Sequence, residues 1–207
     1  MIENNKLQIF GYVAILVIVI SLLTLGFKLT GKVTDTGVLN VTIESSAAIN
    51  FTTDFVDLGS GQVNITGGFK SANLTTLDGG TVEGGNWSVG AIDYFVIENT
   101  GNVNVSLQLY TGQNAASFIG GTSDGGPVYQ YNFTEVVGEE GSCTASGEAT
   151  AGTWIDVNAT SPGTTICNPL EFTDAYDSIR IDVNLLIPDD ATPGTQTDTF
   201  TATATAV

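Results

Sequence analysis

Alternation of apolar and polar residues in four separate stretches constrains this chain more than any other feature. The alternation recurs over residues 39–44, 102–109, 129–134 and 179–187. Successive side chains of a strand point to opposite faces of its sheet, so this pattern predicts strands with one buried face. Glycine pairs between these stretches predict tight turns. We therefore predict an all-β fold of two packed antiparallel sheets, a β-sandwich of the immunoglobulin-like or jelly-roll-like kind.

An uncharged apolar run, Leu7 to Phe27, precedes the strands. At about 1.5 Å per residue, a helix of this length crosses a hydrocarbon core of about 30 Å. The run is long for a signal peptide and lacks an A-x-A-like cleavage motif. We predict an uncleaved single-pass anchor, with a cleaved secretory signal as the alternative. Residues 1–27 then form the anchor or signal, 28–37 a polar stalk and 38–207 an extracellular domain.

The charge balance excludes several classes of function. Five Lys and Arg residues stand against 22 Asp and Glu, which gives a formal net charge of -17, and there is no His. A nucleic-acid-binding chain needs a basic surface, which this composition lacks. The absence of His removes the usual general base and metal ligand. The G-x-S-x-G, P-loop and Rossmann motifs are also missing, so we predict that the protein is not an enzyme.

Sites for N-glycosylation are the strongest motif signal. An exported domain with many N-x-[ST] motifs is predicted to be a glycoprotein, although Asn and Thr are also simply common in this chain. The eight motifs begin at Asn40, Asn50, Asn64, Asn73, Asn86, Asn104, Asn132 and Asn158. Asn40, Asn104 and Asn132 fall on the polar faces of predicted strands.

Cys143 and Cys167 are the only cysteines. In an exported domain two cysteines usually form a disulfide, which we predict here. Two free thiols or half of a metal site are the alternatives, but two Cys without His make a weak zinc site.

Several acidic residues occur in pairs. Oxygen ligands on loops of an acidic exported protein suit calcium, and Asp174 and Asp177 are the first candidates. Solvated surface charge is the simpler interpretation, because no EF-hand-type loop is present. No other cofactor is expected. The remaining pairs are Asp54/Asp57, Glu139/Glu140 and Asp189/Asp190.

The carboxyl-terminal segment predicts self-association. Residues 197–206 alternate Thr with Ala and carry no charge after Asp198, so they suit an edge strand that can pair with another chain. The extended segment from Val33 to Val41 is the candidate strand donor. Repulsion at the net charge of -17 opposes assembly, and salt or divalent cations would screen it.

Three stretches resemble uncharacterised exported β-sandwich proteins of small-genome archaea. They are Asn40–Asn64, Asn86–Gly121 and Cys167–Ala206. This resemblance implies a β-sandwich and a location at the cell surface, and it brings no catalytic residues.

Two further resemblances concern filaments. The segment ENTGNVNVSL, residues 98–107, is similar to the N-T-G turn of extracellular fibre-forming β-sandwich subunits of the TasA kind. A hydrophobic helix that leads into a β-domain is also similar to archaeal type IV pilins and archaellins. The first residues, MIENNKLQIFG, depart from that class because they lack a basic residue followed by Gly at the processing site.

The sequence thus supports a structural glycoprotein of the cell surface, a subunit of an envelope layer or a pilin-like filament. The alternative is an adhesin that binds carbohydrate or a neighbouring cell. Trp87 and Trp154 can stack on a sugar ring, but large aromatic residues of a sandwich usually pack in the core.

Overall fold

The computed structural model describes residues 3–26, 36–89, 94–145 and 147–207, with the side chains of the first segment described over residues 9–22. The chain divides into two units, Met1–Ile43 and Glu44–Val207. The division falls six residues after the predicted start of the extracellular domain. The stalk predicted over residues 28–37 lies, up to residue 35, outside the described residues.

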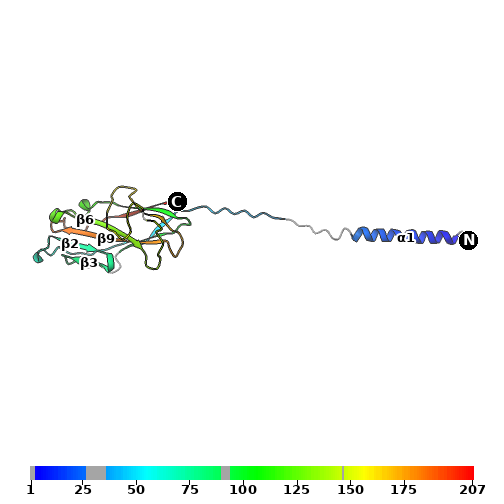
Figure 1. Ribbon diagram of the computed structural model, residues 1–207, viewed down its shortest axis with the longest axis horizontal. Helices are drawn as coiled ribbons and strands as arrows, with labels where there is room; N and C mark the ends of the chain where they lie inside the picture. The colour runs from blue at the N-terminus through cyan, green and yellow to red at the C-terminus, as the bar shows by residue number, and fades with distance from the viewer. Residues whose placement is uncertain (1–2, 27–35, 90–93, 146) are drawn as a thin grey trace. The chain divides into compact units, whose positions relative to one another are not determined.

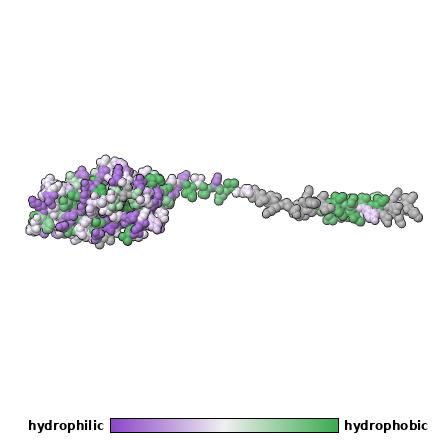
Figure 2. Space-filling model, viewed as in Figure 1, coloured by the Kyte–Doolittle hydropathy of each residue, from purple (hydrophilic) through white to green (hydrophobic). Residues whose placement is uncertain are grey.

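The first unit contains the helix α1, Glu3–Gly26, where the sequence predicted a helix. Its described side chains are hydrophobic over most of their length (Figure 2). Within the described residues, however, no helix is long and apolar enough to cross a membrane, so the predicted anchor at Leu7 to Phe27 is not supported.

The second unit is built of antiparallel sheets (Figure 1). The larger sheet has seven strands: β1 (Ile49–Thr53), β2 (Ser71–Thr75), β3 (Thr81–Glu83), β4 (Phe95–Asn99), β6 (Val128–Glu135), β7 (Ile155–Asp156) and β9 (Ser178–Pro188). The smaller sheet has three strands: β5 (Val105–Thr111), β8 (Thr164–Leu170) and β10 (Phe200–Ala206). The short helices are α2 (Ala115–Phe118), η1 (Ile65–Gly67), η2 (Leu77–Gly79) and η3 (Ser123–Gly125). The prediction of a mostly β domain is therefore confirmed.

Strand β9 organises the larger sheet. Along one side it pairs with β6, and along the other it pairs first with β4 and then with β2. Figure 1 shows β2, β3, β6 and β9 side by side. The odd-numbered residues of β9 from Ile179 to Leu185 are buried, because they face the core while Arg180, Asp182 and Asn184 point to the outer face.

One core joins the two sheets. Side chains of both sheets pack into a single hydrophobic cluster, as the alternation predicted for two sheets with facing apolar sides. Its fully buried members include Ile97, Tyr131, Phe133 and Ile181 from the larger sheet and Leu107, Leu109, Ile166 and Leu170 from the smaller one. A second cluster, formed by β2, β6 and β9, is covered by Phe118, Ile119 and Trp87.

Asn99 ties the turn between β4 and β5 to the end of β8. Its side chain is 1% exposed and donates to the carbonyl oxygens of Val103, Leu170 and Glu171 at 3.0, 3.3 and 3.0 Å. Its Oδ1 accepts from the Gly101 N–H at 3.1 Å. Asn99 is the first residue of the N-T-G turn singled out in the sequence, and its amide supplies buried backbone groups with partners.

The strand predicted over residues 39–44 is wrong. Residues 36–48 form no strand, and Leu39, Val41 and Ile43 are 93%, 80% and 82% exposed. The alternation there suits a strand, but a strand needs a neighbour to accept its backbone hydrogen bonds, and no described strand pairs with this segment.

Candidate functional site

Strand β10 forms an edge of the smaller sheet and pairs only with β5 among the described strands. The sequence predicted an edge strand over residues 197–206, which is confirmed over Phe200–Ala206, while residues 197–199 form no strand. Phe200, Ala202 and Ala204 are half-buried and pack against the core, while the Thr residues between them face outward. Apart from Phe200, the side chains that this edge places over the core are therefore small, and the core reaches the border of the sheet.

The pattern of hydrogen bonds between β10 and β5 identifies which backbone groups of β10 point away from β5. Gly112 N–H donates to the Thr199 carbonyl at 3.0 Å, and Val207 N–H donates to the Asn104 carbonyl at 3.1 Å. With the register Phe200↔Thr111, these bonds put the odd-numbered residues of β10 in hydrogen-bonded pairs with β5. The N–H and C=O groups of Phe200, Ala202, Ala204 and Ala206 consequently point away from β5, toward the open edge.

The opposite edge of the smaller sheet is covered. Backbone groups of residues 144–145 and 147–149 bond to β8, for example Glu148 N–H to the Thr165 carbonyl at 2.8 Å. The predicted disulfide between Cys143 and Cys167 is confirmed, and it attaches this cover to β8. Only β10 thus offers an unprotected edge in the smaller sheet, within the described segments.

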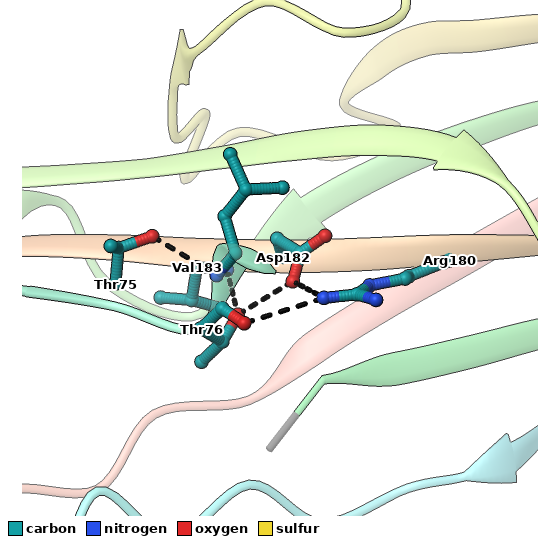
Figure 3. A network of polar contacts seen from close by, with 6 residues as sticks. Thr75, Thr76, Arg180, Asp182 and Val183 are labelled. Carbon is teal, nitrogen blue, oxygen red and sulfur yellow. Dashed lines mark hydrogen bonds and ion pairs between the residues drawn. The ribbon is translucent and has the colours of Figure 1, made fainter. Parts of the chain in front are cut away.

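A buried polar network lies on the outer face of the larger sheet, where β9 changes its partner from β4 to β2 (Figure 3). Arg180 Nη2 donates to Asp182 Oδ1 at 2.6 Å and to the Thr76 carbonyl at 3.3 Å. Thr76 Oγ1 donates to the same Asp182 oxygen at 2.9 Å and accepts from the Val183 N–H at 2.9 Å. The Asp182 side chain is fully buried, and the Arg180 guanidinium lies 3.9 Å from the centre of the Tyr94 ring. Sequence reasoning missed this network because its members are polar residues on the non-core side of strands.

The predicted glycosylation sites differ in exposure. Asn132 is 3% exposed and lies opposite Asp182 in the ladder of β6 and β9. Its burial does not fit a glycan on the folded chain, because the non-core face of a central strand is covered here rather than solvated. The prediction stays for the other seven residues: Asn40, Asn50, Asn64 and Asn86 are exposed, and Asn73, Asn104 and Asn158 are half-buried.

Asp174 and Asp177 lie close to two further carboxylates. Burial raises the pKa of Asp177, and the negative charges of Glu139 and Asp174 raise it further. Burial also raises the pKa of Glu98, with Asp177 as the main charge acting on it. Among the described residues, no group of three or more acidic or Cys side chains is arranged to hold a metal ion. Calcium binding at Asp174 and Asp177 stays a prediction.

Asp190 clamps a loop by accepting backbone hydrogen bonds. Its carboxylate accepts from the Ser123 N–H at 3.0 Å, from the Thr122 N–H at 2.9 Å and from the Thr122 hydroxyl at 2.9 Å. These bonds lower the pKa of Asp190 to about 2. The carboxylate therefore stabilises the folded state above pH 4 or so, and this contribution disappears as the pH falls toward about 2.

An Asp190→Asn variant tests this clamp. We expect the variant to unfold at lower urea concentration than the parent chain at pH 7, and the two unfolding midpoints to converge as the pH approaches about 2. The comparison isolates Asp190, because Asp177 and Glu98 titrate in both proteins. A difference between the midpoints that stays constant from pH 7 to pH 2 would contradict the assignment.

Trp87 does not offer a free ring for sugar stacking, because it is half-buried and packs against the second core cluster. Trp154 is also half-buried. The half-burial of both residues fits a role in packing better than a role in stacking on a sugar.

No protein-family model, curated protein or solved structure matches this chain. Its function is therefore inferred from its own residues.

Proposed function

We propose that this chain is a non-catalytic structural glycoprotein of the cell surface, whose copies assemble into a layer or filament by strand addition at β10. The architecture proposed for its second unit is a β-sandwich, supported by the core that the two sheets share. The observation that carries the proposal is the open edge of β10, because an unpaired edge is a template for a strand from another chain.

The proposed donor is the segment Val38 to Ile43 of a second copy. It has the alternation of a strand but no partner strand among the described residues, and its apolar side chains are 80–93% exposed. Hydrophobic residues recur along it in Figure 2. Placed beside β10, Leu39, Val41 and Ile43 would extend the core-facing row of Phe200, Ala202 and Ala204. Each such side chain contributes about 1.5–3 kcal/mol when it is fully buried.

Charge determines the conditions under which assembly is expected. Residues 44–207 contain 20 Asp and Glu against two Lys and Arg, so two copies repel each other. The donor segment and β10 themselves carry no charge. Association should therefore strengthen as salt shortens the screening length from about 10 Å at 0.1 M.

The disulfide and the glycosylation motifs support the proposed location. A disulfide that attaches a loop to a core strand is typical of proteins that fold in an oxidising environment. The four exposed motif residues, Asn40, Asn50, Asn64 and Asn86, leave glycans accessible to solvent. The alternative, an adhesin, shares this location but does not require self-association.

Sedimentation of the full chain in mild detergent, across a series of salt and calcium concentrations, tests the proposal. We expect oligomers that grow with ionic strength, and electron microscopy should show fibres or sheets. A Val41→Asp variant should raise the concentration needed for assembly by about tenfold or more, because a charge would enter the new interface. Ala204→Pro should act alike, because it removes an N–H that points to the open edge.

Val137→Asp is the matched control, since Val137 is 94% exposed on a loop outside both surfaces. It should assemble like the parent chain. A strict monomer under all conditions, or equal behaviour of the Val41 and Val137 variants, would refute strand addition and favour the adhesin.

A further inference from the structure

A groove crosses the outer face of the larger sheet, away from β10. Its volume is about 470 Å³, within the range of small-molecule sites, and it lies over β2, β3, β6 and β9. Amide, carboxylate and apolar side chains line it, chiefly Phe69, Asn73, Glu83, Gln130, Asn184 and Leu186.

The sheet ladder fixes these side chains in two rows. In one row, Glu83 pairs with Asn73 and Asn73 with Leu186. In the next row, Asn184 pairs with Gln130, and Gln130 with Asp156. Because directly opposed residues lie about 5 Å apart, the rows form a rigid array of polar groups that is organised before any ligand binds.

Hydrogen bonds within the second row orient its amides. Asn184 Nδ2 donates to Gln130 Oε1 at 3.2 Å, and Gln130 Nε2 donates to Asp156 Oδ1 at 2.9 Å. Asn184 Oδ1 is thereby left as an acceptor. The Asn73 amide forms no hydrogen bond with the described residues, so it offers both a donor and an acceptor to the groove.

Phe69 adds an apolar surface at the rim, where its side chain is 41% exposed. Gly84 permits this position, because a Cβ there would lie 2.9 Å from the Phe69 ring and 2.5 Å from the Ser71 carbonyl oxygen. An aromatic ring beside amide and carboxylate groups matches a ligand that has both hydroxyls and flat C–H faces.

Charge and backbone pairing narrow the class of ligand. Among the described lining residues there is no Lys or Arg, and Glu83 is present, so an anionic ligand would be repelled. Strands β2, β6 and β9 are each paired on both sides, so the floor of the groove has no free edge for a peptide strand, and of the four described strands under the groove only β3, at the border of the sheet, has an unpaired side. Ligand hydrogen bonds must therefore come from side chains.

We propose that this groove binds a neutral oligosaccharide, with Asn73, Asn184 and Glu83 hydrogen-bonded to hydroxyls and Phe69 stacked on a sugar ring. This binding site goes beyond the proposed structural function and is independent of strand addition. It also has a consequence for glycosylation, because a glycan on Asn73 would fill the groove. Asn73 must therefore be unmodified in the native protein, although it begins an N-x-[ST] motif.

Calorimetric titration of the full chain carrying Val41→Asp tests the groove without interference from assembly. The probes are cellohexaose, mannohexaose and the hexamer of N-acetylglucosamine, with a hexamer of galacturonic acid as the anionic comparison. We expect at least one neutral probe to bind and the anionic probe not to bind. Asn184→Ala and Phe69→Ala should each weaken that binding by about tenfold.

Phe172→Ala is the matched control, because Phe172 is 43% exposed outside the groove. It should leave sugar affinity unchanged, and all three variants should keep the parent urea midpoint within error. Absence of binding to every neutral probe, stronger binding of the anionic probe, equal loss in the Phe172 variant, or a glycan found on native Asn73 would each overturn the proposal. None of these results bears on assembly through β10.

Discussion

An Arg180→Met variant is expected to lower the free energy of unfolding by about 3 kcal/mol. Asp182 is fully buried, and Arg180 Nη2 contacts its Oδ1 at 2.6 Å. Removing one member of a buried ion pair leaves the other charge without compensation, which costs about 3–5 kcal/mol. We take the lower end because the Arg180 side chain is 24% exposed and water already reaches part of the pair. Urea unfolding followed by tryptophan fluorescence measures the change.

Two companion variants separate charge from packing. Arg180→Met combined with Asp182→Asn removes the stranded charge, so it should recover part of the loss. Tyr94→Leu removes the ring beside the guanidinium while it leaves the ion pair intact, and it should cost much less. A loss below about 1 kcal/mol in the Arg180 single variant, the range of a surface pair, would show that the pair is not effectively buried.

Local alternation predicted the strands whose apolar face meets the core. Strands β5, β6 and β9 occur where the pattern placed them, because one face of each packs into the cluster between the sheets. The same pattern failed at residues 39–44. Alternation states that a segment can form a strand, but whether it does depends on a neighbouring strand, which lies elsewhere in the chain or in another copy.

Alternation also cannot state whether solvent reaches the non-core face. Asn132 and Asp182 follow the polar phase of their strands, yet both are buried on the outer side of the sheet. Asn99 shows a related limit, since two of its carbonyl partners come from Leu170 and Glu171, 71 and 72 residues away. No local sequence signal distinguishes such a residue from an ordinary turn asparagine.

The disulfide shows what the sequence could settle. Two cysteines in a chain with an export-like organisation leave one pairing, and the structure has it. The structural role of the disulfide, which attaches the segment that covers the edge of β8, was not predictable, because it depends on where β8 lies in the sheet. Cys167 is fully buried in the core, and Cys143 forms an isolated antiparallel β-bridge with Leu170 at the end of the same strand.

Reduction of the Cys143–Cys167 bond is expected to lower the free energy of unfolding by about 3.5 kcal/mol. The bond closes a loop with a sequence separation of 24 residues, and the chain-entropy relation gives about 3.5 kcal/mol for a loop of this length. Urea unfolding with and without a reducing agent measures the change on the same polypeptide. A Cys143→Ala, Cys167→Ala variant controls for effects of the reductant elsewhere.

Reduction should also change how the chain associates. The cover over β8 is held by a few backbone bonds, such as Asn168 N–H to the Ala145 carbonyl at 2.8 Å, and by the disulfide. Without the covalent bond the cover opens more often, so the N–H groups of Gly147 and Glu148, which bond to β8, should exchange their hydrogens faster. The outer edge of β8 would then be exposed as a second open edge. Because strands other than the segment Val38 to Ile43 could pair with this edge, Val41→Asp should no longer suppress association fully. Unchanged exchange of those amides after reduction would show that the cover is held by its hydrogen bonds alone, and that the disulfide acts only on the unfolded chain.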